Sequence, residues 1–258
     1  MKTLKLEREA GIARVILSRP ESYNALSFEM AEELAEVGVV LAKDEAVRVL
    51  VITGEGKAFC SGGDLRWVED FAGGPASAFH KLAGRFHNAV VEIRRMPKPV
   101  IAAVNGVAAG AGFTLALACD FRIMARSARY LQAYTSAGLS IDGGGTFILP
   151  RLVGLSRALE IAAFDRPISA EQALAWGLAT EVASDGEALE RAMAMARDLI
   201  QRSLHSFGQV KRLMLESFHT PFETQLERER EAISLCGGHP DGREGIRAFL
   251  EKRKPVFK

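Results

Sequence analysis

Neither sign of charge is in excess in this sequence, since 33 lysines and arginines face 32 aspartates and glutamates and leave a net charge of +1. That balance does not predict the broad basic face that binds nucleic acid or a membrane surface, although a local group of cations can still meet one phosphorylated ligand. Cysteine is scarce as well: Cys60, Cys119 and Cys236 are odd in number and include no CxxC pair, which favours a reducing compartment over a disulfide framework. The first 17 residues lack the apolar core of a signal peptide. We therefore expect a cytoplasmic protein with no nucleic-acid and no membrane partner.

The signatures of several enzyme classes are missing too. There is no GxSxG, no Walker loop, no GxGxxG after a strand and no HExxH. The five histidines show no metal-ligand spacing. Serine hydrolysis and metal catalysis are therefore not indicated, and we expect no metal site.

What the chain does contain is enough apolar sequence for a large core, with 48% hydrophobic and 25% charged residues among 258. Residues 47–53, 99–104 and 121–125 are apolar runs that predict strands buried on both faces, and residues 27–43 and 76–95 have helical periodicity. The uncharged run 99–119 is nearly as long as a membrane span, but Asn105-Gly106, Gly110 and Gly112 interrupt it. These elements predict an α/β core.

From residue 155 onward the pattern becomes mostly helical. Three capping boxes are expected to start helices, at Ser169 with Gln172, Ser184 with Glu187 and Thr220 with Glu223. We place the α/β core at residues 1–202 and a helical extension, too small for an independent domain, at residues 203–258.

Two segments share one design, a buried strand that runs into a glycine-rich turn and then a helix: VRVLVITGEGKAFCSGGDL and VIAAVNGVAAGAGFTLALACD. Glycines let the backbone approach a ligand closely and turn N–H groups toward it. Two such N–H groups that converge on one carbonyl oxygen form an oxyanion hole. Tight packing of turns against helices is the other interpretation of the same pattern.

Six segments, in the same order along nearly the whole chain, resemble the crotonase (enoyl-CoA hydratase/isomerase) superfamily: SRPESYNALS (18–27), GKAFCSGGDL (56–65), KPVIAAVNGVAAGAG (98–112), LALACDFRIMA (115–125), GLSIDGGGTFILPRLVG (138–154) and EGIRAFLEKRKPVF (244–257). The resemblance implies a spiral of ββα units with a C-terminal helical region that builds trimers or dimers of trimers. It also implies an acyl thioester of coenzyme A as the ligand and no separate cofactor. By position, the N–H groups of Gly63 and Ala111 would hold the thioester oxygen, although the family usually has glycine at the second position.

The resemblance also locates the acid/base groups. Hydratases of the family use two glutamates, and Thr114 and Tyr134 stand at those positions here. Neither is a base at neutral pH, so ordinary hydration is not expected. A carboxylate does occur at Asp142, where some relatives with isomerase or dehalogenase activity carry a catalytic aspartate. Without the resemblance, Asp142 would be a turn or helix-capping residue.

The remaining site positions implied by the resemblance are expected to bind substrate: Ala25, Ser61, Asp64, Leu65, His87, Thr114, Tyr134, Phe249 and Lys252. Asp64 can instead cap the next helix, and His87 can be a structural histidine of a long helix. Phe249 and Lys252 match positions that contact coenzyme A from a neighbouring subunit, or else lie on a solvated terminal helix. We expect the acyl pocket to be lined by residues 67–78 and the helix that follows.

The pattern of Thr114, Tyr134 and Asp142 looks most like the ring-epoxide and double-bond isomerases of phenylacetate degradation. The sequence therefore favours an acyl-CoA isomerase-like enzyme that uses Asp142, Gly63 and Ala111. The alternatives are a promiscuous hydratase, an acyl-CoA dehalogenase, or a coenzyme A-binding scaffold with little catalysis.

Overall fold

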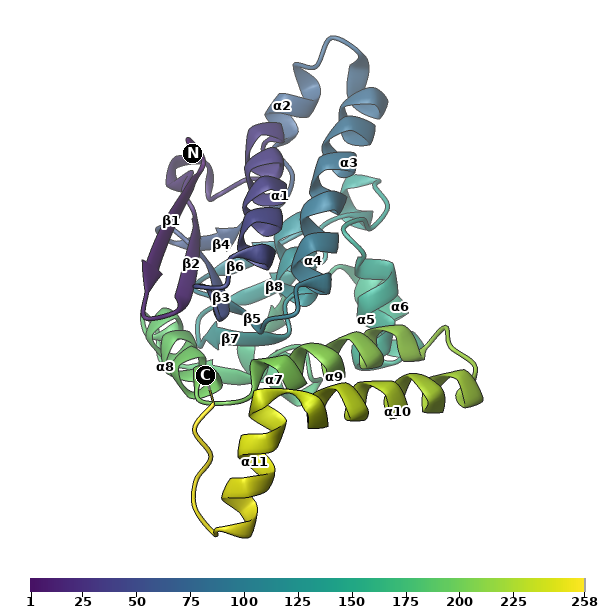
Figure 1. The fold of residues 1–258 in the computed structure, drawn as a ribbon. Coiled ribbons are helices and arrows are strands. Elements are labelled where there is room, and N and C mark those ends of the chain that lie inside the picture. Colours follow the sequence, from purple (N-terminus) through teal and green to yellow (C-terminus); the bar gives the residue numbers. More distant parts are fainter. Residues whose placement is uncertain (258) are drawn as a thin grey trace.

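A computed structural model describes residues 1–257 and builds them around a six-stranded sheet (Figure 1). Its strands follow the order β1 (Leu4–Glu9), β2 (Ile12–Leu17), β3 (Val49–Gly54), β5 (Val100–Val104), β7 (Phe121–Ala125) and β10 (Glu181–Ala183). Strand β1 is antiparallel to β2, and every other pair in the sheet is parallel. The three strands predicted from apolar runs form its centre, because strands buried on both faces need such runs.

A second sheet of four short strands lies beside the first, in the order β4 (Ala58–Cys60), β6 (Val107–Ala109), β8 (Arg129–Leu131) and β9 (Ile168–Ser169). Strands β3, β5 and β7 of the first sheet each lead directly into a strand of the second sheet and then toward a helix. This alternation is the predicted spiral of ββα units, and it confirms the expected fold class. The short strands themselves were not predicted, because two or three residues carry no readable periodicity.

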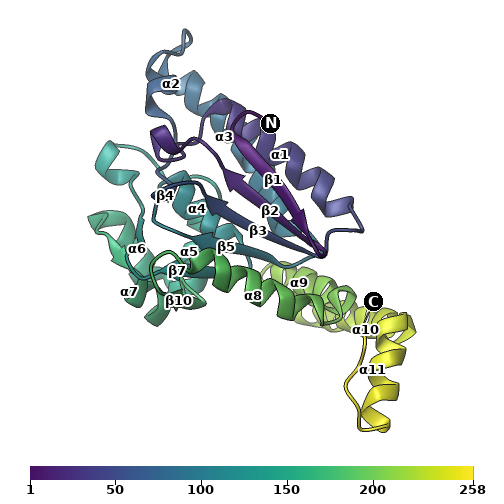
Figure 2. The same cartoon turned by 90° about the vertical axis from the view of Figure 1, so that its left-hand side faces the viewer.

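Helices cover both faces of the larger sheet (Figure 2). The helices of the core are α1 (Phe28–Lys43), α2 (Leu65–Glu69), α3 (Gly74–Arg95), α4 (Ala111–Ala118), α5 (Gly145–Val153), α6 (Leu155–Phe164), α7 (Ala170–Ala175) and α8 (Ala188–Ile200), with 3-10 turns at η1 (Pro20–Ser22) and η2 (Thr135–Ala137). One sheet face packs with α1, α3 and α4 in the main core. The other face packs against Ala192, Met193 and Ala196 of α8.

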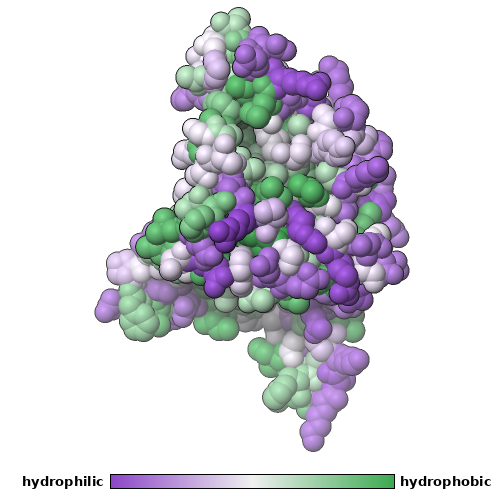
Figure 3. Space-filling model, turned by 180° about the vertical axis from the view of Figure 1, so that it is seen from behind, coloured by the Kyte–Doolittle hydropathy of each residue, from purple (hydrophilic) through white to green (hydrophobic). Residues whose placement is uncertain are grey.

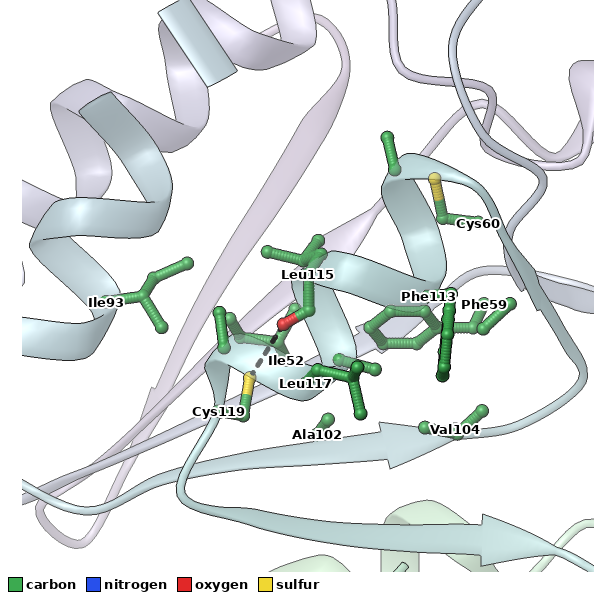
Figure 4. Packing of buried hydrophobic residues seen from close by; sticks show 14 of the residues in the cluster. Ile52, Phe59, Cys60, Ile93, Ala102, Val104, Phe113, Leu115, Leu117 and Cys119 are labelled. Carbon is green, nitrogen blue, oxygen red and sulfur yellow. Dashed lines mark hydrogen bonds between the residues drawn. The ribbon is translucent and has the colours of Figure 1, made fainter. Parts of the chain in front are cut away.

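Helix α4 is buried along its whole length, which explains why the uncharged run does not need a membrane. Its Phe113, Leu115 and Leu117 lie in one packed cluster with Ile52 of β3 and Val104 of β5 (Figure 4). Within residues 1–257, no helix combines the length and the apolar character that a membrane crossing requires.

The last three helices form an extension that we call the C-terminal arm: α9 (Leu204–Ser217), α10 (Phe222–Gly238) and α11 (Pro240–Leu250). Helices α9 and α10 run side by side under the core, and α11 projects away from it (Figure 1). A buried ion pair anchors α9, since Lys211 Nζ lies 2.7 Å from Asp120 Oδ2 and also donates to the carbonyl of Lys98. Lys258, the last residue of the predicted helical extension, lies outside the described residues.

The helix starts show which local signals survive tertiary packing. Ser27 caps α1 by accepting the Met30 N–H, and Ser169 with Gln172 forms the predicted capping box of α7. The boxes at Ser184 and Thr220 were wrong. Helix α8 begins at Ala188 after a tight turn in which the Glu187 N–H donates to the Ser184 carbonyl. The Thr220 hydroxyl donates backward to the carbonyl of Glu216 because it ends α9 instead of starting α10.

The crossing from β3 to β4 depends on Gly54, where an added Cβ would lie 2.1 Å from the Ala58 oxygen. We expect Gly54→Ala to lower the free energy of unfolding by about 2 kcal/mol or more, because the clash is with backbone. The matched control is Gly84→Ala on α3, where nothing lies within 4 Å of the added methyl. It should stabilise by about 0.5–1 kcal/mol. Urea unfolding at one fixed protein concentration compares them, and equal midpoints would contradict the expectation.

Candidate active site

A cavity of about 470 Å³ opens between the first half of α3, the start of α4 and the segment that precedes α5. Its wall consists of Leu26, Ser61, Gly62, Gly63, Leu65, Phe79, His80, Leu82, Ala83, Phe86, Gly110, Ala111, Ala133, Tyr134, Ala137, Leu139, Ser140 and Asp142. The wall is mostly apolar with a few polar groups, which is typical of sites for small organic ligands. Asp142 is its one carboxylate.

The two predicted glycine turns lie against each other in this wall. Strands β4 and β6 pair in parallel with Cys60 opposite Ala108, so the turns that follow them emerge side by side. The contact is so close that a Cβ on Gly62 would lie 3.2 Å from the Ala109 oxygen, and one on Gly110 would lie 3.5 Å from Gly62 Cα. Both glycines also have positive φ, +108° at Gly62 and +51° at Gly110. Glycine is required here for backbone conformation and for close approach.

Both predicted donors, Gly63 and Ala111, line the cavity. Ala111 is the first residue of α4, so its N–H has no acceptor within the helix. This N–H lies at the positive end of the helix dipole. At Gly63 a single bridge to Leu26 uses neighbouring groups: the Leu26 N–H donates to Gly62 O and the Asp64 N–H donates to Leu26 O. The Gly63 N–H therefore stays available. Two free N–H groups in adjacent turns can bind one oxyanion.

An arginine–aspartate pair supports the first turn from behind. Arg19 Nη2 lies 2.9 Å from Asp64 Oδ2, and its other guanidinium nitrogen donates to the carbonyl of Ala25. Asp64 also accepts the Trp67 N–H at 3.3 Å and caps α2. Asp64 and Ala25 do not line the cavity, whereas Ser61 and Leu65 do. The helix-capping interpretation of Asp64 is thus confirmed.

Asp142 is held in the cavity wall by a neighbouring phenol. The Tyr134 hydroxyl donates to Asp142 Oδ1 at 2.5 Å. Burial, followed by the charge of Asp142 and this hydrogen bond, raises the pKa of Tyr134 above its usual value. Tyr134 therefore remains a protonated donor at neutral pH and cannot act as a base there. The sequence placed both residues in one site, but it did not predict their hydrogen bond.

His87 approaches the other side of the same carboxylate. Its Nε2 lies 3.8 Å from Asp142 Oδ2 and accepts the Gly143 N–H at 3.2 Å. A nitrogen that accepts a hydrogen bond carries a lone pair and no proton, so it does not donate to Asp142 in this arrangement. His87 is not part of the cavity wall. The structural interpretation of this histidine, as a support for the Asp142–Gly144 turn, is the one that its contacts show.

Thr114 lies behind the turn that carries Asp142. It is 1% exposed, and its hydroxyl donates to the Ala111 carbonyl at 3.2 Å. The turn packs directly on it: a Cβ on Gly143 would lie 2.5 Å from Thr114 Oγ1 and 2.5 Å from the Phe86 ring. Thr114 thus sets the position of the turn and is not among the residues of the cavity wall.

Several expectations about the wall change with the structure. Residues 67–78, expected to line the acyl pocket, do not reach the cavity, whereas Leu65 and the following helix α3 do. The helix that follows, α3, lines the cavity as expected, through Phe79, His80, Leu82, Ala83 and Phe86, although the sequence analysis did not single out these residues. It also missed Ala137 at the end of η2 and Leu139 and Ser140 beyond it. The helical spacing of those on α3 is the one signal that was present.

The two C-terminal candidates lie far from this cavity within one chain. Phe249 belongs to α11 and is 82% exposed, and Lys252 follows that helix. Figure 3 shows hydrophobic and hydrophilic residues on opposite sides of the projection that α11 forms with the residues after it. Contact of these residues with a ligand in another subunit stays a prediction.

Other chemistries find no support among the described residues. No group of three or more histidines, cysteines or acidic residues in 1–257 is arranged to hold a metal ion. Burial raises the pKa of the Cys60 thiol to about 11 and that of Cys119 to about 12. Both cysteines are buried apolar groups, as expected, and neither supplies a thiolate at neutral pH.

Comparison with known proteins shows which family this chain resembles. The profile of a family described as enoyl-CoA hydratase/isomerase matches residues 7–258. The 1,2-epoxyphenylacetyl-CoA isomerase of Escherichia coli (strain K12) is 41% identical over 250 residues, covering 96% of this chain and 95% of that protein. A 4-chlorobenzoyl coenzyme A dehalogenase of an Arthrobacter species is 33% identical and covers 96% of this chain and 91% of its own. The crystal structure of an enoyl-CoA hydratase from Polaromonas sp. JS666 superimposes with a TM-score of 0.91 at 38% identity, over 99% of both chains.

The raised pKa of Tyr134 gives a testable pH dependence. An unfolded tyrosine ionises near pH 10, so the contribution of Tyr134 to stability is fully present below about pH 10 and is lost as the pH rises above it. We expect Tyr134→Phe to lose less stability than the wild type between pH 9 and pH 11, measured by urea unfolding. Tyr23→Phe is the control, since Tyr23 is 59% exposed. Equal losses in all three proteins would contradict the expectation.

Proposed function

The chain belongs to the enoyl-CoA hydratase/isomerase family, and we propose that within it the protein is an isomerase of acyl-CoA thioesters. Its substrate would carry an unsaturated or ring-bearing acyl group, in keeping with the 41% identical relative named for 1,2-epoxyphenylacetyl-CoA. Coenzyme A enters as part of the substrate, and the proposed reaction uses no separate cofactor. The observation that carries the proposal is the single carboxylate in the cavity wall, Asp142, next to two free N–H groups.

In the proposed mechanism, the thioester oxygen lies between the Gly63 and Ala111 N–H groups. Removal of a proton from a carbon near the thioester places negative charge on that oxygen, and the two donors stabilise the enolate. In comparable sites one lost donor costs about 2.7–4 kcal/mol of transition-state stabilisation. The rigid contact between the two turns supports this role, because preorganised donors need no rearrangement during the reaction.

Asp142 would remove the proton and return it elsewhere on the acyl chain. Its Oδ1 is occupied by the Tyr134 hydroxyl, which leaves Oδ2 as the base. Tyr134 stays protonated, and Thr114 is buried and absent from the cavity wall, so the two positions where hydratases of the family carry glutamates supply no base here. Asp142 remains the one carboxylate of the wall. One base that takes and returns the same proton suits isomerisation better than addition of water.

Dehalogenation is the second candidate, and one observation favours it. His87 Nε2 lies 3.8 Å from the Asp142 carboxylate, and a 33% identical relative is named as a dehalogenase of 4-chlorobenzoyl-CoA. In that reaction Asp142 would attack the halogen-bearing carbon as a nucleophile, the halide would leave, and water would hydrolyse the resulting ester. The hydrogen bond from Tyr134 reduces the nucleophilicity of Asp142, and His87 already accepts the Gly143 N–H. We therefore rank dehalogenation and weak hydration below isomerisation.

Asp142→Asn tests the proposed base. Asparagine keeps the shape of the side chain and an oxygen that accepts the Tyr134 hydroxyl, but it cannot take up a proton. We expect turnover to fall at least about a hundredfold while binding of coenzyme A and the melting temperature remain close to the wild type. The substrate would be found by a thermal-shift screen of unsaturated and ring-bearing acyl-CoA thioesters, with products identified by mass spectrometry.

The same experiment separates the alternatives. An unfolded Asp142→Asn protein would make Asp142 a structural turn residue, and normal turnover would move the base elsewhere. Hydration of crotonyl-CoA by the wild type at about 10⁶ M⁻¹s⁻¹ or above would favour a hydratase. If the wild type binds coenzyme A without turnover, and Asp142→Asn binds it equally well, the protein would be a scaffold.

We also propose that the chain forms a homotrimer or a dimer of trimers through the C-terminal arm. Large apolar side chains are exposed along it, including Leu226, Ile233, Ile246, Phe249 and Leu250. Several large exposed apolar side chains on neighbouring helices favour an interface with another copy of the chain.

Light scattering of the wild type should therefore give three or six times the mass of one chain. Ile233, 72% exposed on α10, is the position to change. Ile233→Asp should shift the protein toward smaller species because it buries an unpaired charge. Glu231→Gln on the same helix is the control and should leave the assembly intact. A wild type that stays monomeric at micromolar concentration would contradict the proposal.

A further inference from the structure

A second cavity of about 1000 Å³ lies where α9 passes beneath the lower ends of α3 and α5 (Figure 1). It shares no wall residue with the candidate active site. Its size is within the range of small-molecule sites, and its apolar part includes Val91, Phe147, Leu204 and Leu215. The proposed isomerase reaction makes no use of this cavity.

The wall of this cavity is strongly cationic. Arg94, Arg95, Lys211, Arg212 and Arg228 all line it, together with one carboxylate, Glu216. Two of the five cations are neutralised, since Lys211 pairs with Asp120 at 2.7 Å and Arg228 with Glu216 at 2.9 Å. Within residues 1–257 the other three arginines pair with no carboxylate, which leaves the cavity with a net positive charge.

Arg94 is the most informative of the three. It is half-buried and makes no hydrogen bond or ion pair within the described chain, and its guanidinium lies 5.7 Å from the Phe147 ring. Burial lowers the pKa of Arg94, which Asp120 partly offsets. The guanidinium carbon of a second arginine, Arg151, lies 3.5 Å from the centroid of the same ring and adds positive charge nearby. A partly buried cation without a partner is costly unless an anion completes its surroundings.

A separate polar group in the same wall lacks a partner. His205 lines the cavity, and its Nε2 is buried with no hydrogen bond. Its ring stacks on His239 at 3.9 Å, which holds it in place. Because Nε2 has almost no accessible surface, an anion in the cavity would contact it only after the imidazole ring shifts.

From these contacts we propose that the second cavity binds a small anion that carries a diphosphate group. Arginine guanidiniums pair with phosphate oxygens through two parallel N–H bonds, and three unpaired arginines match the several charges of a diphosphate. Nucleoside diphosphates and free coenzyme A share this group. The bound anion would offset the repulsion among these arginines and tie α9 of the C-terminal arm to α3 of the core.

The test is calorimetric titration of the full-length protein with inorganic pyrophosphate, against sodium chloride of equal ionic strength. Binding is expected to weaken at least about tenfold in Arg94→Gln and in Arg212→Gln. Arg212 is exposed on α9, so its variant should fold even if Arg94→Gln does not. Arg85→Gln is the matched control on α3, since Arg85 pairs with Glu32 on the surface. It should bind as the wild type does.

Two further measurements identify the ligand and the site. Pyrophosphate that binds equally well with the active site saturated by an acyl-CoA supports a separate site, and competition between them overturns it. Titration with ADP shows whether a nucleoside adds affinity to the diphosphate. The proposal fails if pyrophosphate binds no better than chloride, or if both arginine variants bind like the wild type. It also fails if Arg94→Gln dissociates the oligomer while pyrophosphate has no effect, because another copy of the chain then supplies the anion.

Discussion

The contact between the turn after β4 and the turn after β6 is the constraint on which the candidate active site depends. Gly62 lies close to Ala109 and Gly110, and Gly62 and Gly110 both have positive φ, so a side chain is disfavoured in either turn. This closeness follows from the parallel pairing of β4 with β6, which starts both turns at the same edge of the second sheet. As a result, Gly63 and Ala111, which are almost fifty residues apart in sequence, line one cavity. Neither requires a side chain, so the family member can carry alanine at the second position and keep the donor.

Next to these two turns, the cavity wall contains one carboxylate, that of Asp142, and neighbouring side chains hold it in place. Tyr134 holds one oxygen of Asp142, while His87 and Thr114 hold the turn that carries it. Burial keeps the phenol of Tyr134 protonated, so the carboxylate is the one group in the wall with basic oxygens. Under the proposed mechanism, the same backbone site would bind an enolate in several reactions, and the side chains beyond it would decide which one occurs.

The C-terminal arm combines two kinds of surface that a single chain leaves unsatisfied. Its outer faces expose apolar residues such as Ile233 and Phe249, which fit an interface between copies. Its inner face, on α9, contributes Lys211, Arg212 and His205 to the second cavity beneath α3 and α5. The buried pair of Lys211 with Asp120 fixes the arm to the core between these two surfaces. Assembly and ligand binding would therefore act on the same three helices.

The sequence by itself determined the central strands, the capped helix α1, the two glycine turns and the presence of Asp142, because each depends on local periodicity, capping or backbone freedom. Its resemblance to a known family supplied the fold class, which the structure confirms. Only the tertiary structure revealed strands β4, β6 and β8, which are too short for a periodic signal. It also decided that Tyr134 donates to Asp142, that Thr114 lies behind the cavity wall, and that three arginines from α3 and α9 share a second cavity. These relations join side chains that are distant or differently oriented along the chain, and close packing, which no local pattern encodes, brings them together.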